Sequence, residues 1–380
     1  MNFDALSAYL DTLARADIKQ FVCCVAQNHE VLYSKAVGHF DHACTVPADL
    51  NGIYLLYSVT KVLTCTAALR LMEEGRIGLD DPVSKYLPAY KNLTVRTEAG
   101  IVPSETPMTV RHCFLMESGY GARLNPDIVA AVEACRARNP EAGTVEIVSA
   151  FADTPLEFVP GTHYKYGLSH DILAAVVEVA SGMTFGEYLK KNIFDPLEMT
   201  DFTFRLSPEQ EPRLCHMFRY DSLLNRSTPI PMPNVQPYGT NFESGGSGLY
   251  GSPMQYLRFA DALACGGVAD NGYRVLRAES IAMAQKNLLS DVPLGEFRKS
   301  PRKYGYGWGL CGRVHMDSAI SLSRSPEGEF GWDSAAASYV LMDTKNKLSI
   351  YCAMQTRECT YAYEKIHPHV RDLVYDLLKL

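Results

Sequence analysis

The sequence predicts a mixed α/β fold, an α+β sandwich in which one antiparallel sheet is built from both termini and flanked by helices. Strand-like runs at 21–26 and 31–37 are separated by a polar turn, and a second pair lies at 336–342 and 348–354. Helical patterns and irregular loops dominate the chain between these pairs. This order favours a single sheet with an inserted, mainly helical lobe.

Four helices complete this outline. An amphipathic pattern predicts a helix over residues 3–16, before the first strand pair. The stretch 62–69 carries no charge, which predicts a central buried helix that ends near Gly75. A third helix begins near Asp171, and a proline opens a closing helix over 368–378.

We expect one structural unit spanning 1–380, without internal repeats. Residues 1–79 and 291–380 should form the α/β lobe, and residues 80–290 the mainly helical lobe.

Composition excludes several classes of function. The 380 residues are 47% hydrophobic and 21% charged, with a formal net charge of −7 and no basic face, so a nucleic-acid partner is not expected. No apolar stretch is long enough to span a membrane. Eleven cysteines without C-x-x-C spacing, and an N-terminus without a secretory pattern, predict reduced thiols and a cytoplasmic protein.

The strongest chemical pattern is Ser58-Val-Thr-Lys61 at the start of the central helix. Residues three apart share a helix face, so the hydroxyl and the amine can meet. A serine at a helix N-terminus also lies where backbone N–H groups favour a developing anion. Lys61 opens an apolar segment, and poor solvation favours its neutral, proton-accepting form. The alternative is an ordinary solvated serine and lysine on a helix surface.

Two further segments are candidates for the same site. Tyr166 lies in the loop directly before the Asp171 helix, where it could face Ser58. The segment 328–337 combines glycines and small residues at the start of a strand, which lets a substrate approach backbone N–H groups. The alternatives are an ordinary packing tyrosine and a tight connection against the core.

In this order, these elements resemble the serine β-lactamase and penicillin-recognising family, in particular its class C β-lactamase-like branch with carboxylesterase and D-aminopeptidase relatives. The resemblance covers nearly the whole chain. It rests on the motifs Tyr57-Ser-Val-Thr-Lys-Val-Leu-Thr, Leu71-Met-Glu-Glu-Gly, Thr109-Val-Arg-His112, Ser118-Gly119, Pro160-Gly161-Thr162 with Tyr166, and Ser244-Gly-Gly-Ser-Gly248-Leu249.

The resemblance implies a β-lactamase/transpeptidase-like fold and a role for each matched residue. Ser58 would be the acylated nucleophile and Lys61 its partner in proton transfer. Tyr166 would share the role of base, and the resemblance leaves open which of the two acts. The backbone N–H groups of Ser58 and Ala335 would form the oxyanion hole.

Two departures from the family pattern define the expected substrate pocket. Leu168 replaces the asparagine of the Y-x-N element, and Trp332-Asp333-Ser334 stands where K-T-G or H-x-G is usual. The cation that would pair with a β-lactam carboxylate is therefore missing, which disfavours penicillin-like substrates. His170 could also line the pocket, or lie on the surface at the helix start.

We therefore expect a serine hydrolase that cleaves a small-molecule ester or amide through an acyl-enzyme, with carboxylesterase activity preferred. An amidase or D-aminopeptidase, a weak β-lactamase and an acyltransferase are alternatives, as is a non-catalytic binding member of the family. No cofactor is predicted. No metal is predicted either, because the pairs His39/His42 and His367/His369 lack supporting ligands. The oligomeric state is not indicated.

Overall fold

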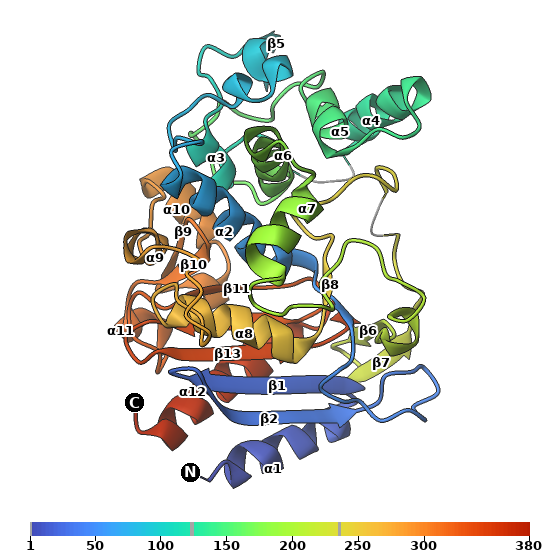
Figure 1. Ribbon diagram of the computed structural model, residues 1–380, viewed down its shortest axis with the longest axis vertical. Coiled ribbons are helices and arrows are strands. Elements are labelled where there is room, and N and C mark those ends of the chain that lie inside the picture. The colour runs from blue at the N-terminus through green and yellow to red at the C-terminus, as the bar shows by residue number, and fades with distance from the viewer. Residues whose placement is uncertain (1, 122–124, 235–236) are drawn as a thin grey trace.

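A seven-stranded antiparallel sheet forms the centre of the computed structural model, which describes residues 2–121, 125–234 and 237–380 (Figure 1). In spatial order its strands are β2 (Glu30–Gly38), β1 (Gln20–Gln27), β13 (Leu348–Ala353), β12 (Tyr339–Asp343), β11 (Phe330–Asp333), β10 (Gly312–His315) and β9 (Tyr306–Gly309). The N-terminal strand β1 pairs directly with the C-terminal strand β13. The predicted sheet built from both termini is thus confirmed.

Both predicted strand pairs form hairpins. The strand expected at 336–342 begins later, at Tyr339, because the backbone of Ser334 bonds to that of Ser338 and closes a turn there. At the far end of β12, the Asp343 carboxylate accepts hydrogen bonds from the backbone N–H groups of Lys345 and Asn346, which fixes the hairpin turn.

Side chains of β1 point alternately to the two faces of the sheet, and both faces are buried. Phe21, Cys23 and Val25 pack with helices α1 (Asp4–Thr12) and α12 (His367–Leu378), which cover one face. Val22 and Cys24 belong to the larger core on the other face, which α8 (Pro253–Ala264) covers. Successive side chains of a strand point to opposite faces, so one apolar run serves two layers.

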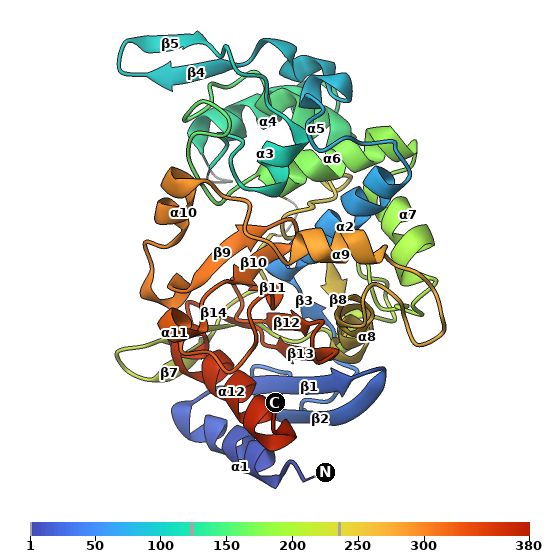
Figure 2. The same ribbon diagram turned by 90° about the vertical axis from the view of Figure 1, so that its left-hand side faces the viewer.

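The helical lobe lies above the sheet (Figure 2). Its helices are α2 (Thr60–Glu73), α3 (Val110–Phe114), α4 (Pro126–Arg138), α5 (Thr144–Phe151), α6 (Ser169–Ser181) and α7 (Phe185–Leu189), and it carries the hairpin β4 (Thr94–Thr97) and β5 (Gly100–Pro103). The predicted uncharged helix is α2, which packs against α6 at the centre of the molecule. Gly75 follows it in the left-handed region, at φ 72°.

Shorter elements connect the two lobes. They are β3 (Tyr54–Leu55) with β8 (Tyr250–Gly251), β6 (Phe218–Asp221) between β7 (Arg226–Pro229) and β14 (Thr356–Arg357), and the helices α9 (Ala278–Ala284), α10 (Asp291–Phe297) and α11 (Ser318–Ser321).

The expected lobe boundaries at residues 79 and 290 both need a correction. Helix α2 lies within 1–79, yet it packs against α6 of the helical lobe. Helix α8 lies inside the segment 80–290, yet it packs on β1, β12 and β13. Strand β6, in the same segment, pairs with β14 near the C-terminus. The chain therefore returns to the sheet lobe well before residue 290, because the sheet needs α8 to cover its second face.

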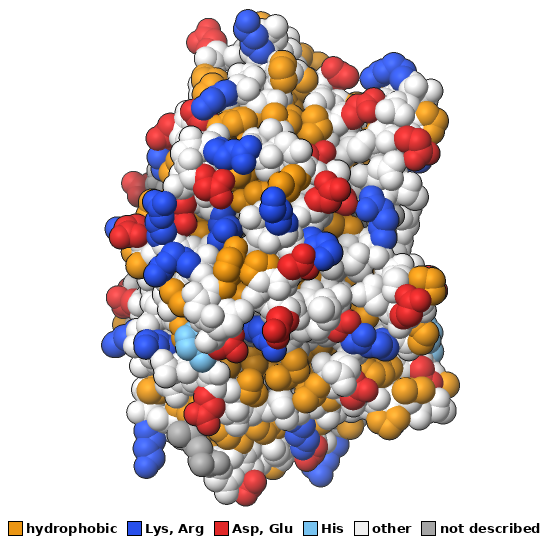
Figure 3. Space-filling model, in the orientation of Figure 1, with side chains coloured by type: hydrophobic (Ala, Val, Ile, Leu, Met, Phe, Trp, Pro, Cys, Tyr) orange, Lys and Arg blue, Asp and Glu red, His pale blue; other side chains and the backbone are white. Residues whose placement is uncertain are grey.

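Charged side chains of both signs are interspersed over the face shown in Figure 3. Within the described ranges, no single helix is both long and apolar enough to cross a membrane. Helix α6 and the segment Phe185–Phe194 meet those criteria only when joined, and they are bent by 75° at the break between them.

Candidate active site

Ser58 lies in a tight turn between the two lobes. It belongs to the 3₁₀ turn Tyr57–Val59, directly before α2, and not to the first α-helical turn as expected. The preceding Tyr57 has a φ of 47°, a left-handed conformation that is rare for residues other than glycine and is often found at functional sites. Arg357 donates a hydrogen bond to the Tyr57 hydroxyl at 3.3 Å and so helps to hold this turn.

Lys61 brings its amine to Ser58 as the spacing predicts. Its Nζ lies 3.3 Å from Ser58 Oγ and donates to the backbone oxygen of Gly246 at 2.5 Å. The lysine is 5% exposed, and its amine also lies 4.6 Å from the ring centroid of Tyr166. The structure therefore brings Ser58, Lys61 and Tyr166 together.

The loop that holds Lys61 is itself fixed by α6. The buried Asp171 carboxylate accepts hydrogen bonds from Ser244 Oγ at 2.5 Å and from the Gly246 N–H at 3.2 Å. Thr64 of α2 donates to the Gly245 oxygen at 2.7 Å. A Cβ at Gly245 would lie 2.4 Å from the backbone oxygen of His170, so only glycine permits this close approach.

Tyr166 is placed by its loop and by the third motif. The backbone N–H of the neighbouring Lys165 donates to the Met116 oxygen at 2.9 Å. The indole N–H of Trp332 donates to the Tyr166 hydroxyl, also at 2.9 Å. Although 36% of Tyr166 is exposed, its hydroxyl end lies among Ser58, Lys61 and Trp332.

The phenol of Tyr166 is harder to ionise than usual. Burial is the largest cause and raises its pKa, and the negative charges of Asp333 and Asp171 act in the same direction. Hydrogen bonds with Ser58 and Trp332 lower the pKa, but the net shift is well upward. Tyr166 therefore stays protonated in the resting protein at neutral pH.

The third motif forms the turn that follows β11. The Ser334 hydroxyl accepts a hydrogen bond from the Ser338 N–H at 3.0 Å, so it closes the turn and does not face the substrate pocket. Ala335 lies exposed at the tip. Ala336 packs in one apolar cluster with Tyr57, which brings this turn beside the turn that carries Ser58.

Asp333 is paired. Its carboxylate lies 3.2 Å from Arg302 Nη1. The adjacent Lys303 lies over the Trp332 ring, with Nζ 5.9 Å from the centroid. Cations are thus present beside the third motif, although they come from a segment 30 residues upstream.

Leu168 and His170 do not line an open pocket. Leu168 is 1% exposed and begins α6 from within the core. His170 is fully buried, and its Nε2 lies 3.2 Å from the Phe114 oxygen. Burial lowers the pKa of His170 to about 3. The loop turns inward directly after Tyr166, so Leu168 lies in the core and His170 faces α2 and α3, with Nε2 near Cys65 Sγ and the Phe114 oxygen.

One group of potential metal ligands occurs among the described residues. His29, Asp261 and Cys265 have ligand atoms within 4.8 Å of one another. The group lies between the β1–β2 turn and α8, where His29 Nδ1 is 2.7 Å from the Asp261 carboxylate. A hydrogen bond that fixes a hairpin to a helix accounts for this contact.

Sequence analysis missed the residues that support the site from a distance. Asp171 is recognisable only as an acidic residue in the first turn of a predicted helix. Gly246 lies in the motif Ser244–Leu249, but its contact with Lys61 spans 185 residues and is not visible in the motif. Arg302 carries no signal in sequence, because its contact with Asp333 spans 31 residues.

Comparison with known proteins places the chain in a family. Residues 8–365 match the Beta-lactamase family, and the chain belongs to it. It is a serine hydrolase of the β-lactamase/transpeptidase fold, as the motifs imply.

Similar proteins include esterases. Esterase EstB of Burkholderia gladioli is 28% identical over 377 residues, covering 93% of this chain and 90% of its own length. Lovastatin esterase of Penicillium rubens is 27% identical over 314 residues, covering 76% of this chain and 77% of its own length. The solved structure of simvastatin synthase LovD from Aspergillus terreus superposes with a TM-score of 0.83 at 21% identity, over 99% of both chains, which shows the shared fold.

Proposed function

We propose that the protein hydrolyses small carboxylic esters through an acyl-enzyme on Ser58. The observation that carries this proposal is the 3.3 Å separation between Ser58 Oγ and Lys61 Nζ, with the Tyr166 ring beside the same amine. A hydroxyl next to a proton acceptor is the arrangement that nucleophilic catalysis needs.

Lys61 is the proposed proton acceptor. As Ser58 Oγ attacks the carbonyl carbon, its proton passes to the amine of Lys61, which must be neutral to accept it. Tyr166 keeps its proton at neutral pH because of its raised pKa, so it serves as a donor toward the leaving alcohol and is then reprotonated from Lys61. Water repeats the sequence on the acyl-enzyme and releases the acid.

The oxyanion of the tetrahedral intermediate would be bound by two backbone N–H groups. One belongs to Ser58 and the other to Ala335, at the tip of the turn after β11. The contacts of β11 with the turn Tyr57–Val59, and the apolar cluster that Ala336 and Tyr57 share, support this pairing, because they hold the two turns near each other.

An ester is favoured over a β-lactam or a D-amino acid peptide. Asp333, whose own carboxylate would repel a substrate carboxylate, is paired with Arg302. The buried Leu168 offers no amide to a substrate. The esterase names of the relatives from Burkholderia gladioli and Penicillium rubens point to the same substrate class.

We propose that the protein resides in a reducing compartment such as the cytoplasm, where thiols remain unoxidised. All eleven cysteines are free, including the fully buried neighbours Cys23 and Cys24.

Labelling with a fluorophosphonate probe tests the proposal. Wild-type protein should be labelled with one equivalent, at Ser58, and should hydrolyse p-nitrophenyl acetate. Ser58→Ala should lose both, whereas Ser84→Ala, a serine outside the site, should keep both. Folded wild-type protein that is neither labelled nor active would refute a catalytic role and favour a binding protein.

A further inference from the structure

A second pocket lies behind the third motif. It has a volume of about 390 Å³ and is enclosed by the segment 300–304, strands β10 and β11, and the start of α12. Trp332 and Asp333 form part of its wall, so it borders the candidate active site. Its other walls carry an unusual number of cations, which are Arg302, Lys303, Arg313 and Arg371.

Arg313 has a hydrogen-bond donor that is not satisfied within the protein. The side chain lies between two rings, 5.3 Å from the centroid of Tyr306 and 5.2 Å from that of Tyr339, and the residue is 8% exposed. One Nη donates to Glu329, but the buried Nε has no hydrogen-bond partner. An unsatisfied buried donor costs about 1–3 kcal/mol, which a bound acceptor would recover.

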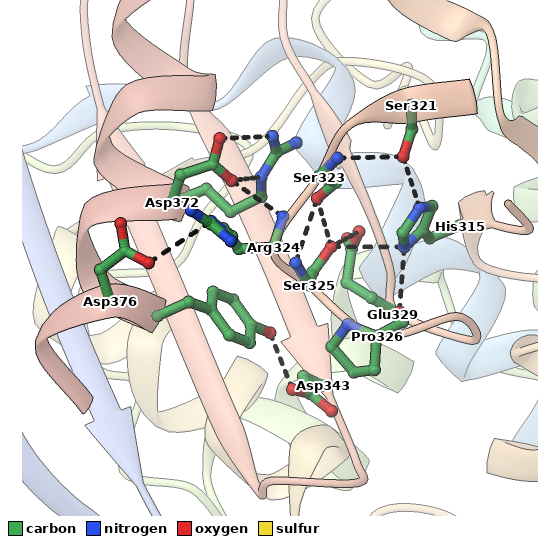
Figure 4. Close-up of polar contacts among 12 residues, drawn as sticks. His315, Ser321, Ser323, Arg324, Ser325, Pro326, Glu329, Asp343, Asp372 and Asp376 are labelled. Carbon is green, nitrogen blue, oxygen red and sulfur yellow. Dashed lines mark hydrogen bonds and ion pairs between the residues drawn. The ribbon is translucent and has the colours of Figure 1, made fainter. Parts of the chain in front are cut away.

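Arg371 is held rigidly beside it. Its Nε and Nη2 donate to the Asp372 carboxylate at 2.7 and 3.2 Å, and its Nη1 donates to the Tyr306 hydroxyl at 3.0 Å. Figure 4 shows the network around Asp372, in which the carboxylate also accepts from the backbone of Arg324. The carboxylate thus fixes this guanidinium beside the pocket before any ligand arrives.

The mouth of the pocket is also cationic. Arg302 lies 4.7 Å from the ring centroid of Tyr363 and pairs with Asp333. Burial is the largest cause that lowers the pKa of Lys303 to about 8, and the positive charge of Arg302 acts in the same direction. A bound anion would offset this repulsion between the two cations. Three of the four cationic side chains that line the pocket are paired with carboxylates, Arg302 with Asp333, Arg313 with Glu329 and Arg371 with Asp372. Lys303 is the fourth cation, and Glu364 also lines the pocket.

We propose that this pocket binds a small organic anion, a carboxylate or a phosphate ester, through Arg302, Lys303 and Arg313. Fixed guanidinium groups bind such planar or tetrahedral oxyanions with several charge-assisted hydrogen bonds. The volume accommodates a small metabolite and excludes a macromolecular partner.

The pocket also contacts the backbone of the third-motif turn. Tyr363 donates its hydroxyl proton to the Ser334 oxygen at 2.6 Å, and His367 Nε2 lies 2.9 Å from the Ala337 oxygen. A bound anion would therefore lie against two side chains that hold the turn bearing Ala335. The binding proposal itself does not depend on the proposed ester hydrolysis.

Isothermal titration calorimetry with inorganic phosphate and, separately, with acetate tests the proposal. We expect saturable 1:1 binding of at least one of them to wild-type protein. Arg302→Ala and Lys303→Ala should each weaken it at least about fivefold, since each removes a charged donor. Arg324→Ala is the matched control, because that arginine pairs with Asp376 and does not line the pocket.

Ser58→Ala separates this site from the candidate active site. Its affinity for the anion should equal that of wild type, and this measurement stands whether or not the protein is an esterase. The proposal is overturned if neither anion gives saturable heat up to about 20 mM. It is also overturned if Arg302→Ala and Lys303→Ala weaken binding no more than Arg324→Ala does, or if Ser58→Ala abolishes it.

Discussion

Trp332 donates its indole N–H to the hydroxyl of Tyr166 across 2.9 Å and so joins the third motif to the loop before α6. The two rings are also in contact, with centroids 5.5 Å apart. The bond occupies one lone pair of the phenol oxygen, which also has a hydrogen bond with Ser58. Trp332, which stands in the K-T-G position of the family, thus interacts here with Tyr166 of the candidate active site.

This contact predicts coupled effects of two substitutions. Trp332→Phe removes the donor but keeps an aromatic ring, and Tyr166→Phe removes the acceptor. Tyr166→Phe should lower kcat for p-nitrophenyl acetate by about 10²- to 10⁴-fold, since a positioned proton donor contributes on that scale. Trp332→Phe should also lower kcat, because it removes the group that positions this donor. The double variant should be little worse than Tyr166→Phe alone, as a double-mutant cycle would measure. Independent, multiplicative losses would show that the hydrogen bond has no catalytic role.

Lys61→Ala should reduce the rate of acylation by about 10²- to 10⁴-fold, because it removes the proton acceptor. Stopped-flow measurement of the p-nitrophenol burst reports acylation directly, and circular dichroism checks the fold. Lys85→Ala, which removes a surface lysine paired with Asp81, is the control and should react as wild type does. A normal burst in Lys61→Ala would assign the base to another group.

The sequence predicts the local parts of this site well. Ser58 and Lys61 are three residues apart, so helix geometry alone determines that they meet. The sheet formed from both termini follows from two apolar strand pairs with polar turns. Both inferences depend on patterns within short stretches of sequence, and such patterns determine local helix and strand geometry.

The parts that depend on tertiary contacts could not be predicted in this way. Asp171 supports Lys61 only through the loop at 244–248, and Arg302 neutralises Asp333 from another segment. Leu168 is expected in the pocket because it replaces the asparagine of the Y-x-N element, and His170 either in the pocket or on the surface at the helix start. Both residues are buried, because the chain turns into the core at that point. Proximity in sequence to a catalytic candidate does not determine the direction of a side chain.

The Arg302–Asp333 pair predicts the substrate preference. Nitrocefin should be hydrolysed far more slowly than p-nitrophenyl acetate, because the Asp333 carboxylate stands in the third motif, where it would repel the nitrocefin carboxylate, and Arg302 is already paired with it. Comparison of kcat/KM for the two substrates on one preparation measures the ratio. Asp333→Asn removes the repelling charge and frees Arg302, so it should shift the ratio toward nitrocefin. A wild-type preference for nitrocefin would contradict this interpretation of Trp332 and Asp333.

Glu117 should make the stability of the fold depend on pH. The residue is 5% exposed, and burial raises its pKa from 4.5 to about 7. Between these values the native state holds a proton that the unfolded chain releases. The stability that the neutral carboxyl contributes is therefore complete below pH 4.5 and is lost as the pH rises through 7. The shift corresponds to roughly 3 kcal/mol of unfolding free energy.

Glu117→Gln mimics the neutral carboxyl at every pH. Its advantage over wild type in urea unfolding should therefore be larger at pH 8 than at pH 5, by up to about 3 kcal/mol. Glu105→Gln, at an exposed position, is the control and should show no such change. Measuring the difference between variant and wild type removes the opposite contribution of carboxylates with lowered pKa, such as Asp80 and Asp81. A difference that stays constant with pH would show that Glu117 is ionised at no cost in the native state.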